Sequence, residues 1–400
     1  MVGPYRGLFN EPGVKGFVLA GFIGRFPMSM LGIGIVLLIS ALTGSYATAG
    51  AVAAVVNVSY AIAAPLSGRL ADRFGQNRVI FPFAVVNAVA LVSLILSAGF
   101  RLPEWTLYAS GLLVGATSLS LGSMVRARWS NRHGGSAKLH TAFAFESVAD
   151  EVIFVTGPAA VTLLATYVNP YAGLVVAVVA MLGGSLALAA QRRTQPPIVA
   201  VRSVSGTPIL IPGIALLSAV YVGLGAVFGS VDLITVAFAE EHGAKGAAGF
   251  LLASFAGGSM VSGLWFGSRH WRIPMRGRFV RALGVFVVGL LPIMFVGDTR
   301  VMALALFIAG LAISPTLITG FSLTERLVPP SLLTEGMAWI STSIGFGVAL
   351  GAWAGGRLTE AFGASNAYAF SLACALLAAI VGVSGSGLLR IPEAPSPAKS

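Results

Sequence analysis

The chain is a series of long apolar runs separated by short polar segments. Each run is close to the about 20 residues that an α-helix needs to cross the hydrocarbon core of a bilayer. Lipid offers no partner for backbone N–H and C=O groups, so runs of this length predict helices, which satisfy those groups internally. We therefore predict an all-α membrane protein with twelve transmembrane helices, at residues 14–40, 46–70, 78–99, 105–128, 141–166, 170–191, 208–239, 246–268, 279–297, 301–322, 333–357 and 365–389.

The low content of charged residues excludes a soluble protein of this size. Hydrophobic residues make up 56% of the chain and charged residues 10%, whereas a soluble domain carries about 25% charged residues. The net charge of +11 does not indicate a nucleic-acid partner, because no basic run is interleaved with aromatic residues. Loop arginines at the membrane edges account for this charge.

Basic residues are distributed unevenly between the two sides of the predicted bundle. Twelve spans place both termini on one side. Of the 25 Lys and Arg residues, 20 fall on that side, four fall on the other, and Arg25 lies within the first span. Because cytoplasmic loops carry an excess of Lys and Arg, we predict a multi-pass protein of the cell membrane with both termini in the cytoplasm.

A polar stretch near the midpoint divides the chain into two parts. The segment Gly263–Arg269 lies about half a chain beyond Gly68 and again opens a basic loop, although it lacks an aspartate. Such weak internal similarity is typical of a transporter built from two repeats, so we predict two pseudo-symmetric six-helix halves in a monomeric protein. The expected parts are an N-terminal half at 1–191, a cytoplasmic linker at 192–207, a C-terminal half at 208–390 and a disordered Pro- and Ser-rich tail at 391–400.

The densest polar stretch of the first hundred residues follows the second span and reads Gly68-Arg69-Leu70-Ala71-Asp72-Arg73-Phe74-Gly75-Gln76-Asn77-Arg78. Gly75 is expected to end a helix, because glycine accepts a left-handed backbone at no steric cost. The stretch resembles the loop between helices two and three of the major facilitator superfamily, Gly-x-Leu-Ala-Asp-Arg-x-Gly-x-(Arg/Lys)-(Arg/Lys). Asn77 occupies one of the two basic positions and Arg78 keeps the other.

The resemblance implies a secondary active transporter, closest in pattern to bacterial drug- and sugar-efflux-type proton antiporters. It assigns a gating role to the motif residues Gly68, Asp72, Arg73, Gly75 and Arg78. In that family the motif aspartate approaches the start of helix eleven and holds the outward-facing state closed on the inside. We expect helix eleven to begin with Ser331 as its N-cap, behind two prolines. A helix N-terminus carries about half a positive charge, which would stabilise the Asp72 carboxylate.

Arg25 is the clearest charge within a predicted span, about 16 Å from its start at 1.5 Å per residue. A charge at mid-membrane costs about 2.5–3.5 kcal/mol on insertion scales, so it needs a partner or a function. We consider two interpretations. Arg25 either pairs with a carboxylate on a neighbouring helix or lines the transport cavity, where it would bind substrate or set the pKa of an acid.

The fifth span carries Glu146, Asp150 and Glu151. The first two share one helix face, and Glu151 points about 100° away. Carboxylates at close range disfavour double ionisation, so one of them could hold a proton near neutral pH, as a proton-coupled carrier requires. The alternative is a static salt-bridge cluster with the cations of neighbouring loops and helix ends, which are Arg73, Arg126 and Arg128.

Further candidates rest on single features. Gly157-Pro158 resembles the core of the Gly-Pro motif of proton-coupled drug exporters and predicts a kink, although the flanking glycines of that motif are mostly missing. The middle of the fourth span, 112–121, has no arginine where many exporters place one. By polarity alone, the candidates for the substrate cavity are Arg25, Asn57, Tyr60, Tyr221 and Trp339.

No enzyme signature is present in the sequence, and the four histidines lack metal-ligand spacing, so we expect no enzymatic activity, no metal and no cofactor. The predicted partners are a small-molecule substrate, the proton as coupling ion and the lipid bilayer. We favour proton-coupled efflux of a small organic molecule. The alternatives are a sugar or metabolite permease and, in a different class, a membrane receptor or scaffold that does not transport.

Overall fold

The structure is a computed structural model that describes residues 3–198, 206–244, 247–269 and 271–390, and within these ranges all regular structure is helical. The first half of the chain forms α1 (Gly3–Phe9), α2 (Val14–Thr43), α3 (Tyr46–Phe74), α4 (Gln76–Gly99), α5 (Trp105–Thr117), α6 (Leu121–His133), α7 (Ala137–Tyr167) and α8 (Ala172–Ala190). The second half forms α9 (Pro212–Glu241), α10 (Ala248–Gly267), α11 (Met275–Leu290), α12 (Thr299–Gly310), α13 (Ile313–Leu327), α14 (Leu333–Phe362) and α15 (Ala364–Ser384). The predicted tail at 391–400 lies outside the described residues.

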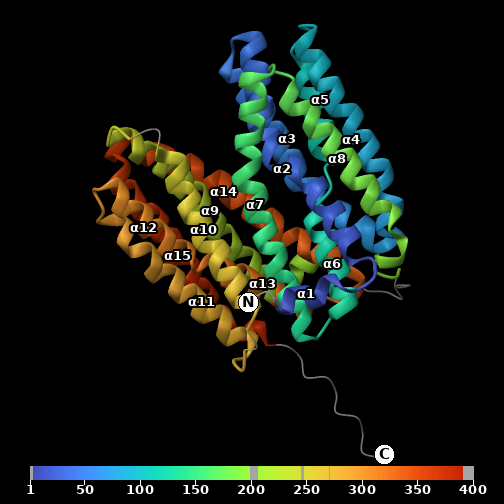
Figure 1. Ribbon diagram of the computed structural model, residues 1–400, viewed down its shortest axis with the longest axis vertical. Coiled ribbons are helices and arrows are strands. Elements are labelled where there is room, and N and C mark those ends of the chain that lie inside the picture. Colours follow the sequence, from blue (N-terminus) through green and yellow to red (C-terminus); the bar gives the residue numbers. More distant parts are fainter. Residues whose placement is uncertain (1–2, 199–205, 245–246, 270, 391–400) are drawn as a thin grey trace, which may run out of the picture.

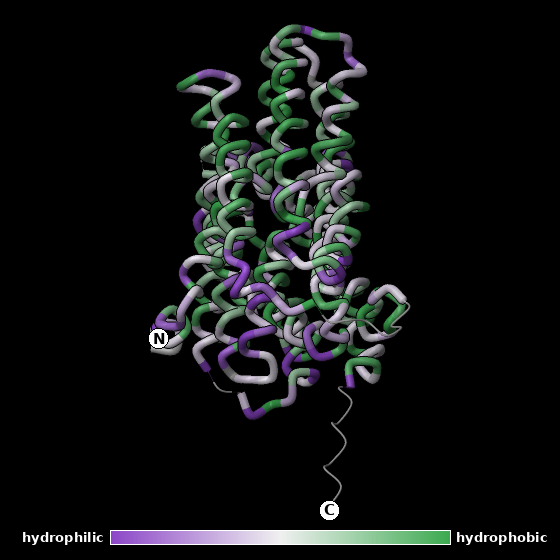
Figure 2. Tube along the Cα trace, turned by 90° about the vertical axis from the view of Figure 1, so that its right-hand side faces the viewer, coloured by the Kyte–Doolittle hydropathy of each residue, from purple (hydrophilic) through white to green (hydrophobic). Residues whose placement is uncertain are grey.

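Twelve helical segments of the described chain are long and apolar enough to cross a membrane. This result confirms the predicted all-α class and the number of spans. Figure 2 shows hydrophobic residues along the helical shafts and hydrophilic segments gathered near the chain's N-terminus. We call this end, which carries α1, the α3–α4 turn and the α6–α7 connection, the basic end, and the opposite one the far end.

Two spans that we predicted as continuous helices, 105–128 and 301–322, are each interrupted. The first breaks between α5 and α6 at 118–120, and the second breaks between α12 and α13 at 311–312. At the first break, buried Asn87 of α4 donates to the carbonyl of Val114 at 2.7 Å, and the Ser118 hydroxyl donates to the same carbonyl at 2.8 Å. Side chains thus satisfy a carbonyl that the helix leaves free. Each break lies in the fourth span of its half, as two-fold pseudo-symmetry requires.

The helices of each half pack mainly on one another, and the halves meet at the basic end. Figure 1 shows α2–α8 and α9–α15 converging near the N-terminus and diverging toward the far end. Between the halves, α3 packs against α14 and α7 packs against α10. In both cases the second span of one half meets the fifth span of the other, so the two contacts are related by the same pseudo-symmetry.

Glycines allow α9 and α14 to approach each other closely within the second half. A Cβ atom added at Gly347 would collide with the carbonyl of Val222, and one at Gly351 would collide with the carbonyl of Ala226. Small residues at such positions are how transmembrane helices bring their backbones together. The glycine stripe of α14 therefore fixes the interior of one half.

We expect Gly351→Ala to lower the thermal stability of the detergent-purified protein, because the new methyl group meets backbone atoms that cannot move independently. Overpacking of this kind costs about 1–3 kcal/mol. Gly345→Ala is the matched control on the same helix, since a Cβ at Gly345 meets nothing within 4 Å. Equal unfolding midpoints for the two variants would contradict the close approach of α9 and α14.

Candidate functional site

The motif stretch forms the turn between α3 and α4 at the basic end. Gly75 ends α3 as the sequence predicts, with a φ of +89° and its N–H bonded to the Ala71 carbonyl at 2.9 Å. Arg73 and Arg78 are exposed, and the guanidinium of Arg73 lies over the ring of Phe74, 5.2 Å from its centroid. Arg73 therefore makes no pair with the acids of the fifth span, and that part of the predicted salt-bridge cluster is wrong.

Asp72 caps the start of α14 from the other half. Its carboxylate accepts hydrogen bonds from the backbone N–H groups of Thr334 at 3.2 Å and Glu335 at 3.0 Å. The first N–H groups of a helix lack partners within the helix and carry a positive partial charge, so a carboxylate both accepts their hydrogen bonds and is stabilised by them. The predicted N-cap at Ser331 is wrong, because α14 begins at Leu333 after a 3₁₀ turn and has no side-chain cap of its own.

Glu335 joins the two halves at the same place. Arg69 donates to both of its carboxylate oxygens at 2.8 Å each, and Thr207 donates to one of them at 2.9 Å. A Cβ atom added at Gly68 would lie 2.8 Å from the Cα of Glu335, so only glycine allows this approach. Glu335 was not among the predicted site residues. Its one signal was an acidic residue in the first turn of a helix behind two prolines.

The symmetry-related contact joins the start of α7 to the end of α10. The Thr141 hydroxyl donates to the carbonyl of Gly267 at 2.8 Å, and Nε2 of His140 lies 3.0 Å from the carbonyl of Phe266. The last carbonyls of a helix lack partners within the helix, so these side chains satisfy them. A Cβ atom at Gly267 would collide with Ala144, which makes this contact as close as the one at Gly68.

Helix α1 strengthens the closure of the basic end. The Tyr5 hydroxyl donates to the carbonyl of Leu264 in α10 at 3.0 Å. The adjacent Glu11 forms ion pairs with Arg132 at 2.8 Å and Lys138 at 3.0 Å. Partial burial opposes ionisation of Glu11, but the hydrogen bonds from these two cations hold its pKa below the ordinary value. The α1–α2 connection is thereby fixed to the first half while Tyr5 contacts the second.

A neutral cluster of four charges lies inside the first half. Arg25 donates to Glu146 at 2.6 Å and to Asp150 at 2.7 Å, and Arg126 donates to the other oxygen of Asp150 at 2.6 Å. Trp129 donates its indole N–H to Glu146 at 2.8 Å. Arg25 is 2% exposed and Glu146 is fully buried. The structure thus brings Arg25 to the two acids that share a helix face, and all four charges are paired.

Arg128 is separate from this cluster, although we expected it there. Its guanidinium donates to Gln76 at 2.8 Å, to the carbonyls of Leu188 at 2.9 Å and Gln191 at 3.1 Å, and to Thr194 at 2.7 Å. Leu188 lies in the last turn of α8, where a cation is stabilised by the negative end of the helix dipole. The role of Arg128 is to hold the end of α8 and the start of the predicted linker.

Glu151 faces the second half instead of the paired charges. It accepts a hydrogen bond of 2.5 Å from Ser259 in α10, and Ser259 is bonded to Ser314 of α13 at 3.0 Å. Among the described residues no cation pairs with Glu151. Arg126 also reaches across the interface, with its guanidinium 4.1 Å from the ring centroid of Phe321. The fifth span therefore carries paired acids on one side and an acid without a counter-ion on the side of the other half.

Gly157 and Pro158 lie inside the continuous helix α7. A Cβ atom added at Gly157 would collide with the hydroxyl of Ser29 on α2. That hydroxyl donates to the carbonyl of Ile153 at 2.9 Å. Gly157 therefore permits a close approach between the first and fifth spans, and the predicted kink stays a prediction.

The predicted cavity residues differ in their exposure, and their role in binding a substrate stays a prediction. Asn57 is exposed and Tyr60 is partly exposed, with its hydroxyl 4.0 Å from the sulfur of Met28. Trp339 is partly buried near the start of α14. Tyr221 is fully buried and donates to a carbonyl of α13 at 2.9 Å, so it belongs to the interior of the second half and lines no open space.

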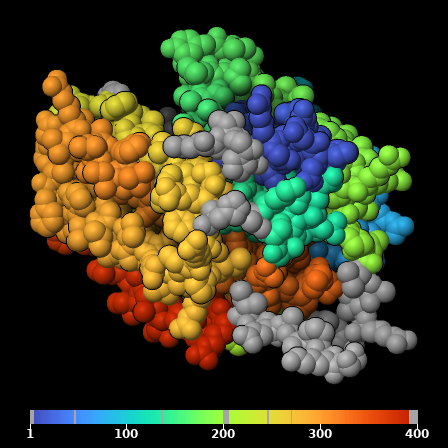
Figure 3. Space-filling model, turned by 60° about the horizontal axis from the view of Figure 1, so that its bottom comes forward, coloured from blue at the N-terminus to red at the C-terminus, as the bar shows by residue number. Residues whose placement is uncertain are grey.

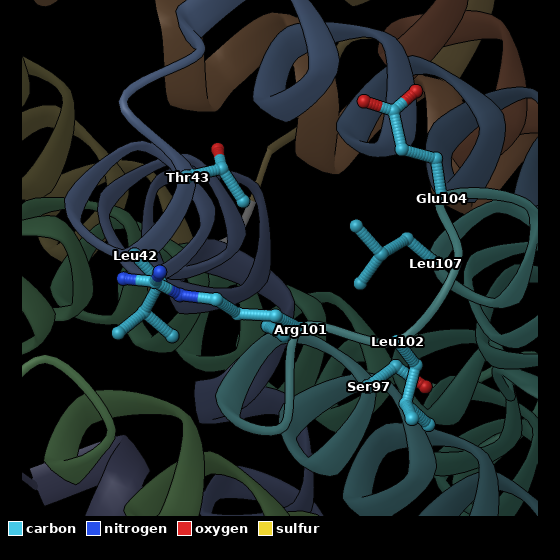
Figure 4. A pocket seen from close by; sticks show the side chains of 8 residues that line it. Leu42, Thr43, Ser97, Arg101, Leu102, Glu104 and Leu107 are labelled. Atoms are coloured by element: carbon cyan, nitrogen blue, oxygen red, sulfur yellow. The ribbon is translucent and has the colours of Figure 1, made fainter.

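A cavity of about 260 Å³ lies at the far end of the first half, away from these groups. It is lined by the ends of α2 and α4 and the start of α5. Figure 4 shows the side chain of Arg101 extending toward Leu42, whereas Glu104 points away from it. The lining shares no residue with the charge cluster or the closed basic end.

A family comparison agrees with this architecture. The model of the Major Facilitator Superfamily matches residues 17–331, which is most of the chain. The protein belongs to the Major Facilitator Superfamily. A search of curated proteins found no match. As a member of this family the protein has the fold of a transporter, and the Gly68–Arg78 stretch is the loop that the motif predicts.

Solved structures of other family members share the fold. A bacterial homologue of the iron transporter ferroportin in the outward-facing state has a TM-score of 0.75 at 15% identity, covering 93% of this chain and 99% of that one. The human organic anion transporter MFSD10 (TETRAN) has a TM-score of 0.71 at 15% identity, covering 93% and 100%. A variant of the E. coli fucose:proton symporter FucP has a TM-score of 0.65 at 14% identity, covering 92% and 99%. Identities this low support the fold alone.

We expect Arg25→Met to destabilise the protein strongly, because Glu146 and Asp150 would stay buried without their shared cation. Removing one partner of a buried ion pair costs about 3–5 kcal/mol. Thermal unfolding in detergent measures the loss, and Arg101→Met at the far end is the control. Adding Glu146→Leu to Arg25→Met should restore part of the stability. A double variant less stable than Arg25→Met would contradict the idea that the unpaired Glu146 carboxylate causes the loss of stability.

Proposed function

We propose that the protein is a proton-coupled exporter of a small organic molecule in the cell membrane, with both termini in the cytoplasm. The observation that carries the proposal is Glu151, a carboxylate between the two halves with Ser259 as hydrogen-bond donor and no paired cation among the described residues. Charge in a low-dielectric region without a counter-ion is costly, so such a group favours binding a proton or a cation. The paired acids Glu146 and Asp150 lack this property.

The basic end is the cytoplasmic end in this proposal, because the positive-inside rule places the excess of Lys and Arg there. The structure is then an outward-facing state, closed inside by Asp72, Arg69 and Glu335. Transport requires these contacts to break while the far ends of the halves come together. Closing the far end over an ionised Glu151 would remove its water. A bound proton or a positively charged substrate would relieve that cost, so the two compete for one site and exchange across the membrane.

Arg126 links the paired charges to the closed end. It pairs with Asp150 and also lies over Phe321 of the second half. A cation over an aromatic ring contributes about 0.5–1 kcal/mol at exposed sites and about 2 kcal/mol or more when desolvated. Any movement of the halves must release Phe321 without releasing Asp150. Arg126 therefore favours the closed state while keeping the interior of the first half neutral.

Glu151→Gln should abolish coupling to the proton and spare folding, because glutamine keeps a hydrogen-bonding side chain and cannot ionise. The protein is first expressed in a host that lacks its own exporters, and a growth-inhibition panel identifies a transported compound. In proteoliposomes, the wild type should use an imposed pH gradient to move that compound, and Glu151→Gln should lose the pH dependence. Glu360→Gln, an exposed acid of α14, is the control. Unchanged pH dependence in Glu151→Gln would overturn the assignment.

Asp72→Asn should shift the protein toward a state that is open at the basic end. The variant loses a charge–dipole interaction of about 0.3–1 kcal/mol, or about 2 kcal/mol if partly buried. A cysteine in place of Trp339, in a Cys374→Ser background, should therefore react several-fold faster with a reagent added on the cytoplasmic side.

Asp298→Asn is the matched control for this measurement. Asp298 caps α12 by accepting from the N–H groups of Arg300 and Val301, at 2.8 Å and 3.0 Å, within the second half and away from the closure. Its loss should leave labelling at position 339 unchanged. Equal labelling rates in Asp72→Asn and Asp298→Asn would show that Asp72 does not hold the basic end closed.

A further inference from the structure

A second cavity, of about 190 Å³, lies at the basic end between the two halves. The first half contributes the α6–α7 connection and the first turn of α7, including Gly135, Ser136 and Thr141. The second half contributes residues 267–269 and Trp271, the first turn of α11 and the end of α13. Figure 3, with this end turned forward, shows the teal segment of α6 and α7 beside the yellow segment of α10 and α11. Both halves thus form the walls of this cavity.

The charges of this cavity are unbalanced. Arg269, Arg278 and Arg326 line it together with one acid, Glu325. Arg326 forms an ion pair with Glu325, with its Nε 3.4 Å from Oε2 of Glu325. The Nε of Arg278 is buried and has no hydrogen-bond partner. A buried donor without a partner is costly, and three cations against one anion leave an excess of two positive charges.

We propose that this cavity binds a phosphate group, carried either by a soluble phosphate ester or by an anionic lipid. Guanidinium groups present several N–H donors that match the oxygens of a phosphate, and charge-assisted bonds of this kind are among the strongest hydrogen bonds in proteins. The hydroxyls of Ser136, Ser322 and Thr141 donate to backbone carbonyls, so the guanidinium groups are the donors for the phosphate. Its volume is below the about 300–1,000 Å³ of pockets for drug-sized ligands. It admits a phosphate headgroup with a few carbon atoms.

The position of the cavity links phosphate binding to the closure of the basic end. The guanidinium of Arg326 in the second half lies close to Gly135 of the first half. A ligand held by groups of both halves binds only the state in which those groups converge, and it shifts the population toward that state. The site therefore acts as a brake on opening of the basic end. It is distinct from Glu151, and its test does not depend on transport.

The test is direct binding to the full-length protein in neutral detergent at constant ionic strength. The soluble probe is glycerol 3-phosphate, followed by the shift in thermal unfolding temperature. The lipid arm compares nanodiscs of phosphatidylglycerol with nanodiscs of phosphatidylcholine. The variants are Arg278→Gln and Arg326→Gln, and the matched control is Arg272→Gln, an exposed arginine of the α10–α11 connection that does not line the cavity.

We expect a saturable rise in unfolding temperature with one probe, and a dissociation constant at least about tenfold weaker in both variants, since each loses a charged hydrogen bond. Arg272→Gln should behave as the wild type. A response to glycerol 3-phosphate identifies a soluble ester, and a response to phosphatidylglycerol alone identifies a lipid headgroup. No stabilisation in either arm, or the same response in Arg278→Gln and Arg326→Gln as in the wild type, would overturn the proposal. Two variants are measured so that the test still holds if one of them fails to fold.

Discussion

The closed basic end depends on helix termini of one half being capped by side chains of the other. Asp72, at the end of the second span, accepts from the first N–H groups of α14. In the symmetry-related contact the direction is reversed, because Thr141 at the start of α7 donates to the carbonyl of Gly267, the last residue of α10. The segment Gly263–Arg269 has no residue that corresponds to Asp72. In the second half, therefore, the end of the second span offers carbonyl acceptors, and the other half supplies the hydrogen-bond donor. Both contacts need glycine for the backbone approach, at Gly68 and at Gly267.

The interior of the first half obeys a different constraint, which is electrical neutrality. Arg25 and Arg126 balance Glu146 and Asp150 within one buried cluster, and Glu146 also accepts a hydrogen bond from Trp129. Buried ion pairs add little net stability, but losing one partner is strongly destabilising. The cluster therefore fixes α2, α6 and α7 relative to one another. It leaves Glu151, one residue further along α7, as the acid of the fifth span that contacts the other half.

The sequence alone predicts what hydrophobic length and local backbone chemistry determine. The twelve spans and the helix end at Gly75 belong to this class, whereas the approach of Asp72 to the eleventh span is expected only from the resemblance of its motif to the family. Local sequence features do not predict contacts between segments that are far apart in the chain. The break at 118–120 depends on Asn87 from another helix. Arg126 and Arg128 are two residues apart and thus point to different sides of α6, and only packing decides which one meets the acids. Glu335 acquires its partners when the halves come together.

Alternating access requires rigid halves and an interface that opens, and the polar contacts follow this division. Within the first half, the Arg25–Glu146 pair is almost fully buried, where breaking it is costly. Across the interface, Arg69 is 44% exposed. Its ion pair with Glu335 therefore stabilises the closed state less than its short distances suggest, and salt screens it. The remaining links are the contact of Arg126 with Phe321 and hydrogen bonds, which are worth about 0.5–1.5 kcal/mol net each, or about 1.5–3 kcal/mol where a charged group takes part. Several weak contacts must break together, so they define one closed arrangement, and yet each is weak enough for that arrangement to open. A shift of about 1.4 kcal/mol changes the ratio of closed to open protein tenfold.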